Sequence, residues 1–342
     1  APELTDVWMA DALLAKAFAE QVRCMQAVYA QADEVLRPMP GAPAAFDVRM
    51  GEIPASFFTP RRNVFSTLFQ STYRALGVPL PRRLLYGVIN HLFRIWVTGA
   101  DNLLDDEDKC VLPLRMPQAS RVMREVVAIM AADRVLGRLL AQAVADGTLT
   151  PAQAAALSDA TLRRLLPSAA QEAGEEDGVD ERADPAYVLE TIHLLKTGML
   201  FNIPFTGFDL VESEVDAEKA ARLKAALRAF GGGCQILDDV RDLARDFVER
   251  RHNYVLSTLA RDRPSVLAAW SQRPLKATDR LYGEVADESF AAARLGLNRL
   301  AEACATFQAE GVFSTTGAPP AAMARAMLSL LDLEDLANED GI

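Results

Sequence analysis

Hydrophobic residues recur at helical spacing along almost the whole chain, and runs of β-branched residues are short. Proline and glycine separate the periodic stretches, as around Gly77 and Pro113. We predict the following helices, with two or three more behind them: residues 6–36, 63–76, 81–104, 120–146, 151–166, 186–202 and 216–251. Near Gly231-Gly232-Gly233 we expect either a break of the helix or a tight packing contact. The expected fold is all-α: one domain over residues 1–342, a helical bundle whose central helices carry polar residues inward.

The charge balance and the cysteines limit the classes of function. The chain holds 47 Asp and Glu against 36 Lys and Arg, a net charge of −11, which argues against nucleic acid and anionic membranes as partners. Residues 172–185 are especially acidic and contain glycine, so we expect a mobile surface loop there. We find no signal peptide and no apolar run long enough to span a membrane. The four cysteines lie far apart, which predicts neither zinc nor disulfides and places the protein in a reducing cytoplasm.

Two acidic clusters interrupt otherwise apolar helical segments. The first reads Asp101-Asn102-Leu103-Leu104-Asp105-Asp106-Glu107-Asp108, and the second reads Asp238-Asp239-Val240-Arg241-Asp242, with Asp246 beyond it. In each cluster, aspartates four residues apart share one helix face. Carboxylates in apolar surroundings need compensating positive charge, and Mg²⁺ prefers carboxylate and water oxygens together with substrate phosphates. We therefore predict that the clusters face each other across a helical cavity and bind magnesium and a diphosphate; the alternative is a pair of solvated, acidic helix ends.

Further motifs stand at regular distances from these clusters. They are Arg61-Arg62-Asn63 about 40 residues before the first cluster, Lys196-Thr197-Gly198-Met199-Leu200-Phe201, Gln235-Ile236-Leu237 leading into the second cluster, and Arg250-Arg251-His252-Asn253-Tyr254 after it. In order and spacing the set resembles the trans-isoprenyl diphosphate synthases, within the class I terpenoid synthase superfamily, over roughly residues 55 to 260. The most specific match is residues 235–242, which are similar to the family motif FQ-x-x-DD-x-x-D.

The resemblance implies an isoprenoid-synthase-type helical bundle around a deep apolar cavity, with three Mg²⁺ ions at its mouth. The substrate would be an allylic prenyl diphosphate, whose C–O bond ionises to an allylic carbocation as the metals stabilise the leaving diphosphate. The implied catalytic residues are Asp101, Asp105, Asp238, Asp239 and Asp242, and the implied metal ligands are Asp101, Asp105, Asp106, Asp238, Asp242 and Asp246. The implied substrate contacts are Arg61, Arg62, Arg94, Trp96, Lys196, Thr197, Gln235 and Arg251. Homodimers are common among proteins of this resemblance.

The first cluster departs from the family motif DD-x-x-D. Its second position is Asn102, and extra acids follow, so the metal ligands are either Asp101 with Asp105 or Asp105 with Asp106. Elongating synthases carry an Arg-Arg pair shortly after this motif, and residues 109–115 contain no such pair. A second substrate, isopentenyl diphosphate, would need its own cationic pocket, for which Arg61, Arg62 and Arg94 are candidates.

The missing arginine pair favours a terpene cyclase, which needs only one diphosphate and steers its cation with cavity walls. The alternative is a chain-elongating prenyltransferase, which the all-aspartate second cluster fits better. Trp96, five residues before Asp101, is expected to line the cavity below the metals or to be a plain core residue.

Two other classes stay open. A non-catalytic regulatory paralogue would share the fold, although such proteins usually lose their acidic motifs. A helical metal-dependent phosphohydrolase normally needs a His-Asp pair, and no His-Asp dipeptide occurs in the sequence. We expect His91, His193 and His252, which are widely dispersed, to be local polar or core residues.

Overall fold

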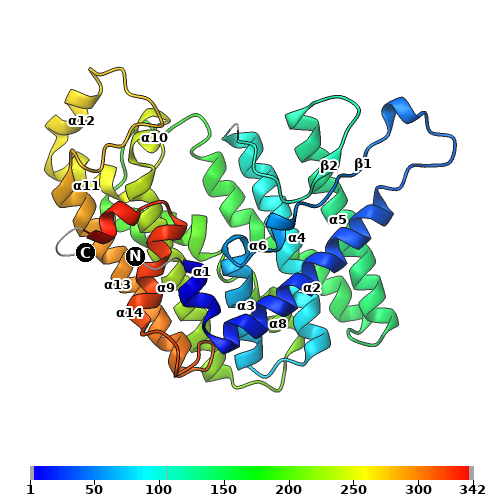
Figure 1. Ribbon diagram of the computed structural model, residues 1–342. Coiled ribbons are helices and arrows are strands. Elements are labelled where there is room, and N and C mark those ends of the chain that lie inside the picture. Colours follow the sequence, from blue (N-terminus) through cyan, green and yellow to red (C-terminus); the bar gives the residue numbers. More distant parts are fainter. Residues whose placement is uncertain (1–3, 106, 339–342) are drawn as a thin grey trace. The chain divides into compact units, whose positions relative to one another are not determined.

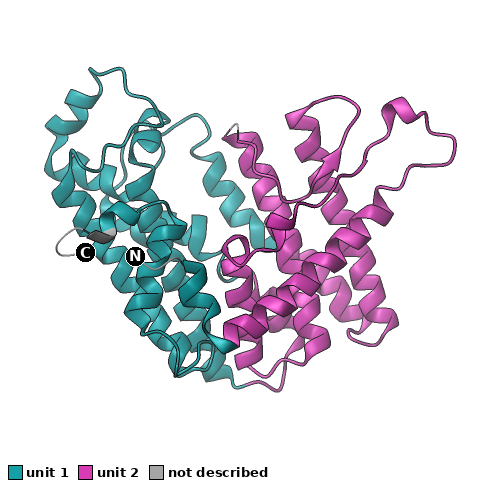
Figure 2. Cartoon of the chain, in the orientation of Figure 1, with its two compact units in different colours: residues 1–12, 163–203, 216–342 teal, residues 13–162, 204–215 magenta. Residues whose placement is uncertain are grey.

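The structure, a computed structural model, describes residues 4–105 and 107–338 (Figure 1). Regular structure in these residues is almost entirely helical, which confirms the predicted all-α fold class. Two short strands, β1 (Arg49–Met50) and β2 (Leu114–Arg115), pair antiparallel, with Arg49 opposite Arg115. The residues group into two compact units, each assembled from separated segments of the sequence (Figure 2). The expectation of one domain stays a prediction.

Unit 1 comprises residues 1–12, 163–203 and 216–342. Its helices are α1 (Leu4–Met9), α7 (Pro185–Tyr187), η4 (Val188–Ile192), η5 (Leu194–Gly198), α9 (Ala217–Arg241), α10 (Leu243–Val248), α11 (Tyr254–Asp262), α12 (Pro264–Trp270), α13 (Ala286–Ala309), α14 (Pro320–Leu330) and η6 (Glu334–Asn338). The helix starts have local causes: the side chain of Asp216 accepts the Lys219 N–H (2.9 Å) and so caps α9.

Aromatic side chains fill the core of unit 1 and tie the first helix to the last ones. The Trp8 ring lies 5.4 Å from the Phe313 ring and 6.1 Å from the Phe230 ring, both edge to face. The Trp8 indole N–H also donates to the Met323 carbonyl on α14 (3.4 Å), and the Leu4 N–H donates to the Ser329 hydroxyl (3.3 Å). Burial of these rings therefore fixes α1 against α14, α9 and the segment after α13.

The helix predicted over residues 216–251 is one helix as far as Arg241 and does not break at its glycines. Instead the glycines allow close packing: a Cβ on Gly233 would lie 2.8 Å from the Gly296 carbonyl oxygen, and one on Gly296 would lie 3.0 Å from the Gly233 oxygen. The backbones of α9 and α13 therefore touch here, as the packing alternative predicted. The helix ends at Asp242, and α10 follows.

Unit 2 comprises residues 13–162 and 204–215. Its helices are α2 (Ala12–Val35), η1 (Ala44–Phe46), η2 (Ala55–Phe58), η3 (Arg61–Asn63), α3 (Val64–Ala75), α4 (Leu80–Leu104), α5 (Arg121–Ala145) and α8 (Phe205–Val211); α6 (Pro151–Ala173) begins in unit 2 and ends in unit 1. The short α8 supplies Phe205, whose ring lies 6.4 Å from that of Tyr73 on α3. Arg82 on α4 binds both oxygens of Glu212 just after α8 (2.6 and 3.0 Å), so this distant segment is held firmly.

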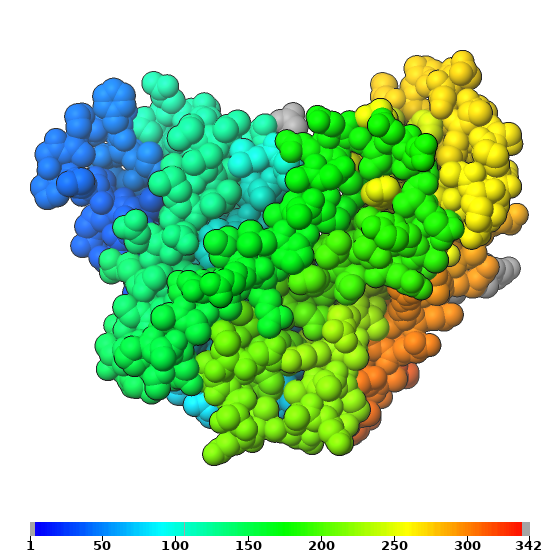
Figure 3. All heavy atoms as spheres, turned by 180° about the vertical axis from the view of Figure 1, so that it is seen from behind, coloured from blue at the N-terminus to red at the C-terminus, as the bar shows by residue number. Residues whose placement is uncertain are grey.

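The middle of the chain differs from the prediction in two ways. The helix expected over residues 186–202 has π-type turns at η4 and η5, a form that often accompanies functional sites. Helix α6 runs on to Ala173, and Glu175 just behind it is only 1% exposed, so the expected mobile acidic loop begins as ordered structure. The middle third of the chain, drawn green in Figure 3, nevertheless forms much of the surface on the face shown there.

Across the described ranges, no helix is both long enough and apolar enough to cross a bilayer.

Candidate functional site

The second acidic cluster lies at the C-terminal end of α9 in unit 1. The Asp242 N–H donates to the Asp238 carbonyl (2.8 Å), so these two aspartates lie one helical turn apart on one face. Arg241 lies against both: its Nε and one Nη donate to the two Asp242 oxygens (2.7 Å each), and it forms an ion pair with Asp238. Burial alone would lower the pKa of Arg241, but these two carboxylates raise it above its usual value. The three side chains are 22 to 34% exposed, so solvent can reach the carboxylates.

Asp239, predicted to be catalytic, is turned into the protein instead. Its side chain is 2% exposed and accepts hydrogen bonds from His193 Nε2 (2.8 Å), Gln235 Nε2 (3.0 Å) and the Tyr254 N–H (2.6 Å). This set of partners leaves the carboxylate holding three segments of unit 1 together rather than facing solvent. His193 is a buried polar residue, as predicted.

The predicted substrate contacts Thr197 and Gln235 belong to the same hydrogen-bond network. The Thr197 hydroxyl donates to the Gln235 side-chain oxygen, while the Gln235 amide donates to Asp239. Both side chains therefore use their polar groups to join η5 to α9 behind the cluster.

Asp246, a predicted metal ligand, is held by Asn253, which the sequence analysis quoted in the motif of residues 250–254 without giving it a role of its own. The Asn253 amide donates to an Asp246 carboxylate oxygen (2.8 Å) and to the Asp239 carbonyl (2.7 Å). Its side-chain oxygen accepts the N–H groups of Val255 and Leu256 and so caps α11. Burial, with the nearby Asp239 charge, raises the pKa of Asp246 well above its usual value. An asparagine directly before an apolar helical stretch was the signal for this cap.

Lys196, a predicted diphosphate contact, is paired inside unit 1. Its ammonium lies 3.2 Å from the carboxylate of Glu175, which also accepts the His252 N–H (2.8 Å). Burial alone would lower the pKa of Lys196, but Glu175 and other nearby acids raise it. Arg251 lies close by and is 12% exposed, with its guanidinium 3.8 Å from Glu172. Two predicted phosphate contacts thus lie beside acids of the segment that the sequence predicted to be a solvated loop.

The first acidic cluster ends α4 in unit 2. The Asp105 N–H donates to the Asp101 carbonyl (2.8 Å), which confirms their one-turn spacing, and both side chains are partly exposed. The other predicted ligand, Asp106, lies outside the described residues. The acids beyond it have local partners: Glu107 lies 2.5 Å from Lys109, and Asp108 pairs with Arg124.

Asn102 stands where the family motif has aspartate. Its side chain is fully buried and forms hydrogen bonds with the backbone of the loop that follows α4. Its amide nitrogen donates to the Lys109 carbonyl (2.7 Å), and its amide oxygen accepts the Lys109 N–H (3.0 Å). An aspartate could not donate to that carbonyl, so this departure from the motif has a structural reason.

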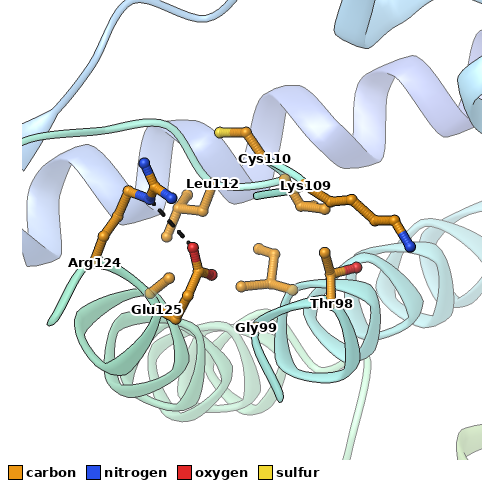
Figure 4. A pocket seen from close by; sticks show the side chains of 10 residues that line it. Thr98, Gly99, Lys109, Cys110, Leu112, Arg124 and Glu125 are labelled. Carbon is orange, nitrogen blue, oxygen red and sulfur yellow. Dashed lines mark hydrogen bonds and ion pairs between the residues drawn. The ribbon is translucent and has the colours of Figure 1, made fainter. Parts of the chain in front are cut away.

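Cations reach the first cluster from the first turn of α5. Arg121 donates to the Asn102 carbonyl, and Arg124 pairs with Asp108 and Glu125. Figure 4 shows the Arg124–Glu125 pair beside a small pocket that α4, α5 and residues 109–112 line. Burial raises the pKa of the Cys110 thiol in this pocket, which makes it a poor nucleophile. Sequence reasoning looked for arginines next to the motif and missed this pair, which stands three residues apart after the helix cap Ser120.

Arg62 and Arg94 form a cationic group in unit 2 with no carboxylate partner among the described residues. The Arg62 guanidinium donates to the Cys110 carbonyl (2.7 Å) and lies 4.1 Å from the centre of the Phe57 ring. The Arg94 guanidinium donates to the Asn63 side-chain oxygen (3.2 Å). Burial and the charge of Arg62 both lower the pKa of Arg94. Two neighbouring guanidinium groups without acidic partners form a site that favours an anion.

Trp96 lies on α4 and contacts α5. Its indole N–H donates to the Ile129 carbonyl (3.3 Å), and its ring meets the Phe93 ring edge to face at 5.4 Å. The side chain is only partly buried, so the choice between a cavity wall and a core residue stays a prediction. Arg61, by contrast, is exposed.

Magnesium fits the donor set if substrate and water complete its shell. Within residues 4–105 and 107–338, no three His, Cys, Asp or Glu side chains gather into a metal-binding group. Mg²⁺ commonly takes only one or two carboxylates and completes its octahedron with water and substrate phosphate. Asp238 and Asp242 already converge on one positive charge, that of Arg241. Asp101 and Asp105 have the same spacing on α4.

Comparison with known proteins connects this arrangement to solved structures. No family model and no curated protein sequence matches the chain. Heptaprenyl diphosphate synthase from Staphylococcus aureus is similar with a TM-score of 0.58 and 13% identity, over 94% of this chain and 98% of that one. Geranylgeranyl pyrophosphate synthetase from Pyrococcus horikoshii Ot3 gives 0.57 and 16%, over 95% and 99%. Polyprenyl synthase from Caulobacter crescentus CB15, solved with calcium and isoprenyl diphosphate, gives 0.55 and 14%, over 92% and 96%.

These likenesses establish the fold. The chain has the all-helical fold of the trans-prenyl diphosphate synthases, as its motifs predicted.

Proposed function

We propose that this chain is a magnesium-dependent class I isoprenoid synthase that elongates an allylic prenyl diphosphate with isopentenyl diphosphate. The observation that carries the proposal is the pair Arg62 and Arg94, whose guanidinium groups lack acidic partners among the described residues. A cyclase binds one diphosphate through its metals and needs no second anion site. The structural neighbours named above, which are prenyl and polyprenyl diphosphate synthases, support elongation in the same way. The preference for a cyclase, drawn from the missing Arg-Arg pair, has no such support.

In the proposed reaction the acidic residues would bind the metal ions and the basic residues would bind diphosphate. When bound, Mg²⁺ would stabilise the negative charge that develops on the leaving diphosphate. Asp101, Asp105, Asp238 and Asp242 would hold the ions, because their carboxylates are partly exposed and spaced one helical turn apart. Lys196 would donate to the leaving diphosphate after parting from Glu175.

Arg62 and Arg94 would hold the diphosphate of the second substrate. The C–O bond of the allylic substrate breaks, and its electron pair leaves with the diphosphate. The double bond of isopentenyl diphosphate then attacks the allylic carbocation, and loss of a proton restores a double bond in the longer product. Burial of Arg94 strengthens its attraction for the anion, because the surrounding dielectric constant is lower than in water.

The direct test is a set of incubations of the full chain with Mg²⁺ and geranyl, farnesyl or geranylgeranyl diphosphate, with and without isopentenyl diphosphate. We expect longer prenyl diphosphates, identified by mass spectrometry, only when isopentenyl diphosphate is present. Hydrocarbon or alcohol released without it would establish a cyclase. No pyrophosphate released from any of these substrates would point to a non-catalytic paralogue.

The second anion site is tested by Arg94→Gln. We expect the KM for isopentenyl diphosphate to rise about 30-fold or more, because a charged hydrogen bond to the diphosphate is lost. The KM for the allylic substrate should change little. Arg138→Gln is the matched control, since the Arg138 guanidinium also donates to a neutral amide (Gln31, 3.0 Å) but on the exposed face of α5. Equal effects of the two variants would contradict the assignment.

A further inference from the structure

Arg241 does more than lie near the second cluster: its guanidinium directly contacts the carboxylates of Asp238 and Asp242. It donates to both oxygens of Asp242 at 2.7 Å and pairs with Asp238 through a shared Nη. One guanidinium thus contacts both candidate metal ligands at the end of α9 and offsets part of their negative charge. Two carboxylates one helical turn apart would otherwise repel each other at the end of the helix, where the backbone dipole is also unfavourable for them.

We propose that Arg241 competes with the divalent cation for Asp238 and Asp242, and that it releases these carboxylates when the cation binds. The inference rests on the proposed function, because it takes these two aspartates to be metal ligands. A guanidinium within hydrogen-bond distance of both carboxylates repels an arriving divalent cation and occupies the oxygens that it needs. The free metal ion then binds weakly, and a metal ion that arrives together with a diphosphate binds more tightly than the free ion. Arg241 is thus a positioning residue that sets the metal affinity of the second cluster.

The test measures metal binding without any prenyl substrate. Mn²⁺ is titrated into the full chain, and the free ion is followed by electron paramagnetic resonance. We expect Arg241→Gln to bind Mn²⁺ about tenfold more tightly than the unchanged protein, because one positive charge beside the ligands is removed. The further change Asp242→Asn in this variant should abolish the gain. Circular dichroism confirms that each variant is folded.

Arg222→Gln is the matched control. Arg222 lies on the same helix and also pairs with a carboxylate (Glu310, 2.5 Å), about 28 Å from Arg241 along the helix axis. It should leave Mn²⁺ affinity unchanged. If Arg241→Gln binds Mn²⁺ no more tightly than Arg222→Gln does, the competition is refuted.

These measurements are independent of turnover, so a chain that fails to elongate prenyl diphosphates and still shows the tenfold gain would overturn the proposed function and leave this inference standing.

Discussion

At the scale of single residues, Asn102 shows why a departure from a motif need not mean a lost function. The resemblance expects a second aspartate there, and the structure gives the position a structural task instead. The buried amide both donates to and accepts from the backbone of Lys109. Asp101 and Asp105 keep their one-turn spacing because both lie at the C-terminal turn of α4, and both side chains are partly exposed.

Restoring the family residue should therefore harm the protein. Asn102→Asp places a carboxylate oxygen against the Lys109 carbonyl, so we expect the free energy of unfolding to fall by about 2 kcal/mol at pH 7. Urea denaturation measures the loss. Asn298→Asp, on the exposed face of α13, serves as the control and should change stability by less than about 0.5 kcal/mol. Equal stability of Asn102→Asp and the unchanged protein would contradict the role of the amide.

Two neighbouring aspartates of the second cluster should respond in opposite ways. Asp239→Ala removes a buried carboxylate with three hydrogen bonds, so we expect a loss of about 3 kcal/mol in the free energy of unfolding. Asp242→Ala removes a partly exposed ion pair and should cost less than about 1 kcal/mol, while it abolishes Mg²⁺-dependent turnover. Unfolding curves and product assays on the same preparations separate the two effects. A stable Asp239→Ala protein would show that this carboxylate has no structural task.

The sequence predicted where the aspartates of the second cluster lie on their helix, but it did not predict which residues they or Lys196 contact. It placed Asp238 and Asp242 on one face, because helical spacing fixes that relation without any tertiary information. It did not assign Arg241 a task, although the residue stands inside the cluster. Glu175 was taken as solvated because its segment is acidic, and only the fold shows that it meets Lys196.

At the scale of elements, the contact between α9 and α13 explains a glycine run that sequence alone left open. Each of Gly233 and Gly296 lies against the other's carbonyl oxygen, so neither position has room for a side chain. Gly232 differs, since a Cβ there would meet only Arg299 at an ordinary 3.5 Å.

This difference predicts that alanine substitutions at the two adjacent positions change the free energy of unfolding in opposite directions. Gly233→Ala forces the helix backbones apart and should lower the free energy of unfolding by about 2 kcal/mol. Gly232→Ala should raise it by about 0.5 kcal/mol, because alanine loses less backbone entropy in a helix. Urea denaturation of both variants decides the matter, and a stabilised Gly233→Ala protein would mean that the helices do not touch there.

The helices themselves were largely predictable, and their irregularities were not. Apolar periodicity placed α4 and α5 to within a residue or two, since each buries one continuous face. The π-type turns of η4 and η5 escaped prediction because hydrophobic periodicity cannot separate them from ordinary helical turns. Strands β1 and β2 are two residues long, too short to show any alternation.

At the scale of the whole molecule, a buried histidine should make stability depend on pH. His91 is fully buried in unit 2, with Nε2 3.2 Å from the Tyr29 hydroxyl. Burial, with the charge of Arg94, lowers its pKa from 6.5 to about 3. Between these values the unfolded chain binds a proton that the folded chain does not, so stability falls as the pH is lowered through this window.

Replacing His91 should make the free energy of unfolding depend less on pH. From pH 7 to pH 5, the proton taken up by the unfolded His91 lowers the free energy of unfolding by about 2 kcal/mol. In His91→Gln that part of the decrease should disappear, whatever the absolute stability of the variant. Urea denaturation at both pH values gives the two slopes. Identical slopes for the variant and the unchanged protein would mean that His91 is protonated in the folded state.

The division into two units could not be found by reading along the sequence. Domain boundaries in a sequence are usually recognised as linkers of distinct composition. Here each unit is assembled from separated segments of the chain, and no change of composition marks where one unit ends and the other begins. The helix α8, for example, belongs to unit 2, although the helices before and after it belong to unit 1.

The pairing of α1 with α14 has a consequence for synthesis. The ribosome releases Trp8 early, yet the carbonyl that accepts its indole N–H lies 315 residues further along the chain. Until α14 emerges, the nascent chain carries an exposed apolar helix that chaperones can bind. A transcript cut short before this point would yield a polypeptide whose unit 1 stays open, and quality-control proteases should clear it rapidly.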